Sequence, residues 1–139
     1  MKQFAEAFGR RLKDTGITRI QWIAMYYIQT HKIISQRELA VLMKVTDSSI
    51  GRLLDRLERD EMVVRLTSET DRRVTMIMLS ERGDAMITAL IPYGDAFNRD
   101  LTEGITSEEL INFENVLEKM IANIKKMDIK VDDEMRESK

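Results

Sequence analysis

The sequence contains no cysteine, and only one histidine, one tryptophan and one proline among its 139 residues. Without cysteine the chain has no disulfide, no thiol nucleophile and no thiolate metal ligand. It also lacks a glycine-rich phosphate loop and a spaced cluster of metal-ligating residues, which argues against a catalytic or metal site. We therefore expect neither an enzyme nor a protein with a metal or another cofactor.

Long apolar runs are missing as well. No stretch approaches the roughly 20 apolar residues of a membrane-spanning helix, and the N-terminal segment MKQFAEAFGRRLKDTG lacks the apolar centre of a signal peptide. We expect a cytoplasmic protein without membrane contacts. With 43% hydrophobic and 33% charged residues, the chain is long enough for one domain with a real core, spanning residues 1–139.

The charged residues are distributed unevenly. Residues 1–34 carry six basic and two acidic side chains (+4), residues 35–73 carry eight of each (0), and residues 74–139 carry eight basic and fourteen acidic (−6). Phosphate groups respond to local charge more than to the net charge of −2. The neutral middle of the chain can therefore still present a basic face.

The N-terminal third shows the apolar spacing of helices. Phe4, Phe8 and Leu12 follow one another at every fourth residue, which predicts a helix that ends near Gly16. A second amphipathic helix is predicted from a stripe that consists of Ile20, Ile23, Ala24, Tyr27 and Ile28.

Two short helices are predicted next, each with a capping signal. Ser35 and Glu38 form a capping box at the start of SQRELAVLM, and Thr46 or Asp47 can cap DSSIGRLLDRLERD. The buried stripe of the second of these helices consists of Ile50, Leu53, Leu54 and Leu57. Two helices joined by a short turn, the second with a polar, arginine-bearing face, are typical of a helix-turn-helix motif.

The polar face of that second helix has the chemistry that base recognition needs. Small residues at its start, Ser48 and Ser49, would let the backbone approach base edges, and Arg52 is long enough to reach guanine O6 and N7. Arg56 and Arg59 lie further along and suit phosphate contacts. The alternative is the solvated face of an ordinary surface helix.

Two β-branched runs, MVVRL and VTMIMLS, flank a polar break that contains Asp71, Arg72 and Arg73. They predict a hairpin with charges at its tip. After a helix-turn-helix, such a hairpin is a wing, and Arg73 could enter the minor groove. Asp71 would pair with Arg73 and hold its guanidinium in one rotamer. The alternative is a surface turn with a weak exposed ion pair.

Together, TRIQWIAMYYI, SQRELAVLMKVTDSSIGRLLDRLERDEMV and DRRVTMIMLSERG resemble the MarR family of bacterial winged helix-turn-helix regulators. The most specific element is Asp71, any residue and Arg73, followed by a strand that ends in Leu79-Ser80 where the family has Leu-Thr. The chain departs from the pattern at Glu61, where the family commonly has glycine after the recognition helix. A left-handed residue other than glycine costs roughly 1 kcal/mol, so the helix could instead end one residue differently and tilt the wing.

The resemblance implies a mainly α fold with a small β-hairpin wing (α+β). Residues 17–80 would form the winged helix-turn-helix lobe, residues 1–16 and 81–127 mainly dimerisation helices, and residues 128–139 a frayed acidic tail. A capping box of Thr106 and Glu109 opens a helix whose long apolar stripe includes Leu110, Phe113, Leu117, Met120, Ile121 and Ile124. By resemblance this surface belongs to a two-fold homodimer, whereas packing within one chain is the alternative.

The function that the resemblance implies is a sequence-specific transcriptional regulator. It would be a dimeric repressor that binds a pseudo-palindromic promoter site in double-stranded DNA and is released by a small aromatic or phenolic effector. A winged-helix module that binds protein without specific DNA binding is the alternative. The expected DNA-binding residues are Ser35, Gln36, Thr46, Ser48, Ser49, Arg52, Arg56, Asp71, Arg72 and Arg73. The candidate ligand-binding residues are Phe8, Trp22 and Tyr26, with ordinary core aromatics as the alternative.

Overall fold

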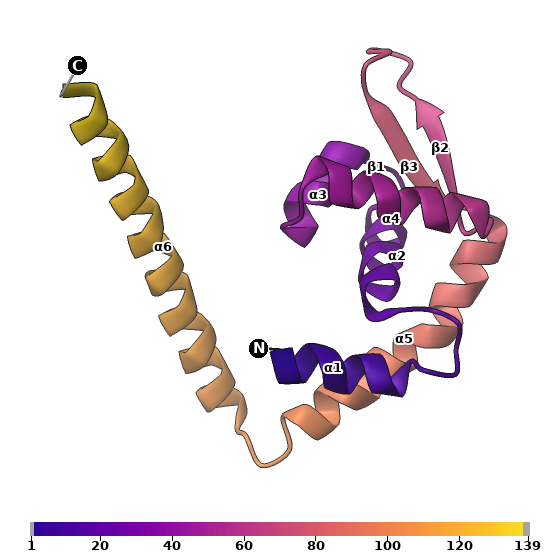
Figure 1. Ribbon diagram of the computed structural model, residues 1–139. Coiled ribbons are helices and arrows are strands. Elements are labelled where there is room, and N and C mark those ends of the chain that lie inside the picture. The colour runs from indigo at the N-terminus through magenta and orange to yellow at the C-terminus, as the bar shows by residue number, and fades with distance from the viewer. Residues whose placement is uncertain (1, 138–139) are drawn as a thin grey trace. The chain divides into compact units, whose positions relative to one another are not determined.

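The computed structural model describes residues 2–137, which divide into two compact units at residue 100 (Figure 1). The first unit contains α1 (Lys2–Arg11), α2 (Arg19–His31), β1 (Ile34–Ser35), α3 (Gln36–Met43), α4 (Asp47–Arg59), β2 (Val63–Thr67), β3 (Thr75–Leu79) and nearly all of α5 (Glu81–Leu101). The second unit contains α6 (Ser107–Glu137). The predicted fold class, mainly helical with a small wing, is confirmed.

Capping side chains set the starts of three helices in the first unit. Thr18 and Ser35 each form a reciprocal capping box, at the starts of α2 and α3 respectively. Thr46, rather than Asp47, caps α4, because the Ser49 amide donates to Thr46 Oγ1 at 3.2 Å. These bonds satisfy amides that have no partner within their own helix.

The three strands form one antiparallel sheet in the order β1-β3-β2. The hairpin of β2 and β3 was predicted, and Figure 1 shows it projecting from the helices of this unit. The two-residue strand β1 was not predicted, because it is too short to show a period of two. Its pairing with β3, Ile34 opposite Ile77, ties the start of α3 to the wing.

The core of the first unit is formed where α2, α3 and α4 pack against the sheet and α5. The predicted stripe of α4 is confirmed, since Ile50, Leu53, Leu54 and Leu57 are all buried. The predicted stripe of α2 is only partly right: the buried residues are Gln21, Ala24, Met25 and Ile28, and Ile23 is half-buried. The periodicity allows several overlapping faces, and the neighbouring elements decide which one is covered.

Two helix ends differ from the expectation. Helix α1 ends at Arg11 instead of near Gly16, and a turn that includes Gly16 at φ 79° leads into α2. At the other end of the chain, α6 continues to Glu137, so residues 128–137 are helical rather than frayed. Ile124, Met127 and Val131 extend the helical apolar spacing through that segment. Residues 138 and 139 lie outside the described residues.

Helix α4 ends in a motif that normally uses glycine. Glu61 adopts φ 59°, its amide donates to Glu58 O at 3.0 Å, and the Met62 amide donates to Leu57 O at 2.8 Å. These two bonds define a Schellman motif with its left-handed residue at Glu61. The expectation that the helix would end one residue differently, to avoid this conformation, is therefore wrong.

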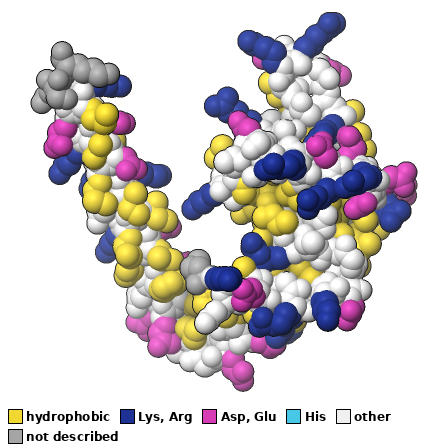
Figure 2. Space-filling view, in the orientation of Figure 1, with side chains coloured by type: hydrophobic (Ala, Val, Ile, Leu, Met, Phe, Trp, Pro, Cys, Tyr) yellow, Lys and Arg dark blue, Asp and Glu magenta, His cyan; other side chains and the backbone are white. Residues whose placement is uncertain are grey.

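No described helix combines the length and apolar content that crossing a membrane requires. Helix α6 is long but amphipathic. Figure 2 shows a row of apolar side chains along it, and the predicted stripe is largely exposed: Phe113, Leu117, Met120, Ile121 and Ile124 have exposed fractions of 40–60%.

Candidate nucleic-acid interface

The outward face of α4 carries the residues predicted to read DNA. Ser48, Ser49, Arg52 and Arg56 are exposed, on the side of the helix away from its buried stripe. Figure 2 shows Lys and Arg side chains, with acidic side chains among them, over the surface of the helix-turn-helix and the wing. An exposed polar face with arginines can approach a groove without removing any core contact.

Three hydroxyl groups are bonded to one another at the start of α4. Thr46 Oγ1 lies 3.1 Å from Ser48 Oγ and donates to Ser49 Oγ at 3.0 Å. They sit at the positive end of the helix dipole, where amides and hydroxyls are suited to acceptor groups. Asp47 lies in the same turn and places one negative charge beside them.

The wing carries a fixed pair of charged residues. Arg73 Nε donates to Asp71 Oδ1 at 3.1 Å and Arg73 Nη2 donates to Asp71 Oδ2 at 3.2 Å. The Arg73 amide also donates to Asp71 Oδ1 at 3.0 Å. The predicted pairing is therefore confirmed. The side-chain bonds from Arg73, and then its backbone bond, lower the pKa of Asp71, while Arg72 and Arg73 remain exposed.

A groove of about 450 Å³ connects the wing with the starts of α3 and α4. Its lining consists of Ser35, Gln36, Arg37, Asp47, Asp71, Arg73, Val74 and Thr75. Ser35 and Gln36 were predicted from the helix-turn-helix, and Asp71 and Arg73 from the hairpin. The structure thus brings these two predicted groups of residues to one surface.

Arg65 was not singled out from the sequence. Its side chain, on β2, donates from Nη1 to Asp55 Oδ1 at 2.6 Å and from Nη2 to the Gly51 carbonyl at 2.9 Å. Both partners lie on α4, so Arg65 joins the wing to that helix. The sequence held one signal: Arg65 alternates with Val64 and Leu66, and so occupies the strand face of the buried Val63.

The three aromatic residues predicted to bind a ligand lie together but pack on one another. The Trp22 ring stacks on Tyr26 with the ring centroids 5.3 Å apart, and it lies perpendicular to the Phe8 ring at a centroid distance of 5.1 Å. Phe8 is buried, and Trp22 Nε1 donates to the Leu90 carbonyl at 2.9 Å. Tyr26, with an exposed fraction of 41%, is the most accessible of the three.

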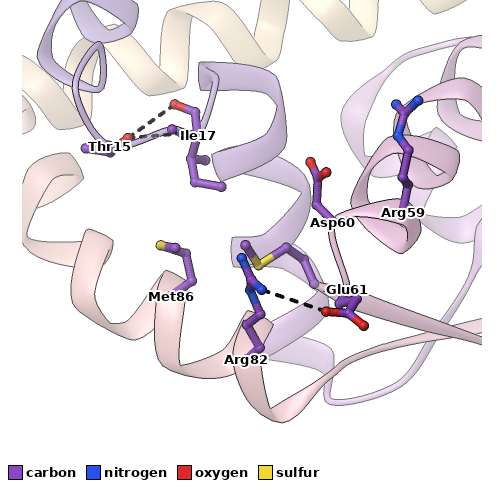
Figure 3. Close-up of a pocket in the computed structure, with 9 residues that line it drawn as sticks. Thr15, Ile17, Arg59, Asp60, Glu61, Arg82 and Met86 are labelled. Carbon is purple, nitrogen blue, oxygen red and sulfur yellow. Dashed lines mark hydrogen bonds and ion pairs between the residues drawn. The ribbon is translucent and has the colours of Figure 1, made fainter.

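A second cavity, of about 450 Å³, lies at the end of α4 (Figure 3). It is lined by Thr15, Gly16, Ile17, Arg59, Asp60, Glu61, Met62, Arg82 and Met86. Arg82 Nη1 lies 3.8 Å from Glu61 Oε2, and both side chains belong to the lining of the cavity. The sequence did not predict this site, because its lining comes from a loop, a helix end and α5. Among the described residues, no cluster of acidic or histidine side chains could hold a metal ion.

Comparisons with known proteins agree with this geometry. Residues 15–74 match the family model described as the MarR family. A variant of MarR from E. coli, solved in complex with operator DNA, is 25% identical and covers 86% of each chain, with a TM-score of 0.78. AbsC from Streptomyces coelicolor, a MarR family transcriptional regulator, is 18% identical over 89% of this chain and 86% of its own, with a TM-score of 0.84.

A third solved structure concerns ligand control. BpsR from Bordetella bronchiseptica, whose DNA binding is regulated by 6-hydroxynicotinic acid, is 16% identical over 86% of this chain and 85% of its own, with a TM-score of 0.77. At that identity the likeness shows a shared fold. The resemblance inferred from the helix-turn-helix and wing motifs is confirmed by the family match.

Proposed function

The winged-helix lobe of this chain belongs to the MarR family of DNA-binding transcription regulators, and from this premise we propose that the protein is a homodimeric repressor. Each subunit inserts α4 into a major groove and places its wing in the adjacent minor groove. Repression follows because the bound dimer blocks RNA polymerase at the promoter.

One observation carries the proposal: the groove of about 450 Å³ whose lining joins the starts of α3 and α4 to the wing. A duplex presents phosphates and two grooves at once, so a binder needs contacts from several elements on one face. Arg52 is proposed to read guanine, Arg56 to meet phosphate, and Arg73 to enter the minor groove, where negative potential is concentrated. The Asp71 carboxylate keeps the Arg73 guanidinium ordered before DNA arrives.

The dimer is supported by the surface of α6. From Leu110 to Val131, apolar side chains recur at alternating intervals of three and four residues, at positions 110, 113, 117, 120, 124, 127 and 131. This is the spacing of a helix that packs along another helix. A two-fold pair of subunits would cover it and would set the two recognition helices about one turn of DNA, ~34–36 Å, apart.

A small aromatic effector is proposed to release the repressor. BpsR indicates that this fold can carry such a response. In this chain the candidate sites are the accessible edge at Tyr26 and the cavity in Figure 3, where Arg59 and Arg82 suit an acidic group. The dimer would exist in two geometries, one that fits DNA and one that fits it less well. A ligand that binds the second geometry more tightly would weaken DNA binding, by an amount set by the difference between its affinities for the two geometries.

Selection from a pool of random duplexes tests the DNA-binding role. After several rounds at about physiological salt, we expect a two-fold symmetric consensus with half-sites about 10 bp apart. Arg52→Ala should relax the preference at one base position. Arg73→Ala should weaken binding. It should also reduce the slope of the logarithm of the binding constant against the logarithm of the salt concentration by about one per site. Arg19→Ala, at the start of α2 and outside the residues proposed for DNA or dimer contacts, is the control for the loss of one positive charge.

The alternative, a winged-helix module for protein contacts, is favoured by one surface. An apolar groove of about 520 Å³ lies between the end of α2 and α3, lined by His31, Ile33, Ile34, Arg37, Glu38, Val41 and Leu42. Ile33 and Val41 have exposed fractions of 48% and 69%. Selection that enriches no sequence, with binding that vanishes in salt, would contradict the DNA-binding proposal and favour this alternative.

A further inference from the structure

Arg65 occupies an unusual position in the sheet. The cross-strand row that contains it also contains Ile77 of β3 and Ile34 of β1. Those two residues are buried, with exposed fractions of 0% and 2%. A charged side chain, itself 22% exposed, therefore holds the third position of a row whose other members belong to the core.

The Arg65 guanidinium contacts α4 at two points. Its bonds to the Gly51 carbonyl and to Asp55 span four residues of that helix, about one turn. A planar group held at two points resists rotation better than a single bond does. On the other side of the hairpin, the pairing of β1 with β3 holds the wing to the start of α3.

We propose that Arg65 is a positioning residue, which sets the orientation of the wing relative to the recognition helix. The inference rests on the proposed DNA-binding function and adds a determinant of it. Asp55 neutralises Arg65, and the guanidinium is turned toward α4, so it acts through the wing instead of on DNA. What it fixes is the distance between the groove that α4 enters and the groove that Arg73 enters.

The length of the wing makes this restraint effective. The four residue-to-residue steps from Arg65 to Glu69 span up to about 13 Å at ~3.3 Å per step, so a tilt of about 10° moves the tip by about 2 Å. The distance between donor and acceptor in a hydrogen bond can vary by only a few tenths of an ångström. A wing without the Arg65 contacts would therefore lose a defined placement of Arg73.

Stability alone does not account for an arginine at this position. Its Nε is buried and has no hydrogen-bond partner among the described residues, and an unpaired buried donor is unfavourable. Methionine could fill the same space with apolar contacts, and the Asp55 carboxylate, which is 66% exposed, would keep its contact with water after losing its partner. The Arg65→Met variant should therefore fold with nearly the stability of the wild type but lack the contacts that orient the wing.

The first test uses the protein without DNA. Hydrogen exchange of the Arg65→Met variant should be faster at the amides of residues 66–76 and unchanged in α2 and α5, with the unfolding midpoint close to that of the wild type. Unchanged exchange in the wing would overturn the proposal, whether or not the protein binds a specific sequence.

The second test is a double-mutant cycle on the selected duplex. The Arg65→Met variant should bind the duplex about tenfold more weakly than the wild type. In a protein that already carries Arg73→Ala, adding Arg65→Met should reduce the affinity little further, because the contact of the wing with DNA is then already lost. Additive losses would overturn the proposal. So would full affinity in Arg65→Lys, which keeps the charge but cannot bridge both partners. A wild type without sequence preference would refute the DNA-binding role itself, and the exchange result would then decide whether Arg65 fixes the wing.

Discussion

At the scale of single residues, Glu61 shows that a termination motif can form without its usual glycine. Both Schellman bonds are present, and the left-handed position that they require, φ 59°, is occupied by Glu61 where glycine is usual. The Glu61 carbonyl also accepts from Ser80 Oγ at 2.5 Å. Tertiary contacts therefore impose a conformation that is disfavoured locally, because its Cβ crowds the backbone.

Glu61→Gly should stabilise the protein by about 0.5–1 kcal/mol, since glycine adopts positive φ without strain. Denaturant unfolding measures this change. Glu61→Ala is the matched control, because it also removes the carboxylate near Arg82 but keeps a Cβ. If both variants had the same stability, strain at position 61 would not be the cause.

Asp71 offers a second prediction at this scale. Because Arg73 stabilises the ionised carboxylate, the pair contributes to stability at neutral pH, and that contribution is lost as the pH falls through the lowered pKa. Arg73→Ala should raise the pKa of Asp71 part of the way toward its usual range, because the side-chain bonds are lost while the bond from the backbone amide of residue 73 remains; an NMR titration of the carboxyl carbons would detect the change. The pKa of Glu38, lowered by bonds from Ser35, should not move. A shift common to both carboxyls would point to a general charge effect instead.

At the scale of elements, the end of α4, the end of β3 and the start of α5 meet at one junction. Ser80 caps α5 by accepting from the Gly83 amide at 2.9 Å, and the Ser80 amide donates to Met62 O at 3.0 Å. Gly83 allows this approach, because a Cβ there would lie 1.9 Å from Met62 O. The wing and the recognition helix are thus fixed to α5 by backbone groups.

Gly83→Ala should destabilise the first unit by roughly 1–3 kcal/mol, because backbone has to move to admit the methyl group. Gly9→Ala is the control: it also lies within a helix, but its Cβ would meet nothing within 4 Å. That variant should be about 0.5–1 kcal/mol more stable than the wild type. Thermal or denaturant unfolding compares the two, and equal effects would contradict the close approach.

At the scale of the whole molecule, α6 carries a large apolar surface that none of the described residues within its own unit covers. An exposed apolar patch of this extent usually marks an interaction site. The expected partner is α6 and the neighbouring helices of a second subunit, so that specific DNA binding and dimerisation should be lost together.

Leu117→Glu should convert the proposed dimer to a monomer, since a carboxylate cannot enter an apolar helix interface without a partner. Sedimentation equilibrium gives the oligomeric state, and binding to the selected palindrome should weaken in parallel. Asn115→Glu, on the same helix but outside the apolar stripe, should leave both unchanged. A wild type that sediments as a monomer would refute the dimer.

Much of the fold followed from local signals in the sequence. The cap at Ser35, the apolar stripe of α4 and the hairpin were all predicted, and Thr46 was one of the two caps predicted for α4, because capping and periodicity act between residues close in the chain. The Asp71–Arg73 pair was predicted for the same reason, as its members are two residues apart.

Tertiary structure alone decided the features that join distant segments. The strand β1, the buried face of α2, the left-handed Glu61 and the bond from Arg65 to α4 depend on which elements pack together, and no local pattern encodes that choice. The sequence by itself determined a helix-turn-helix with an arginine-tipped wing. The packing of the wing against the two helices determined how those parts are set relative to one another, because contacts between elements, and not propensities within them, fix their orientation.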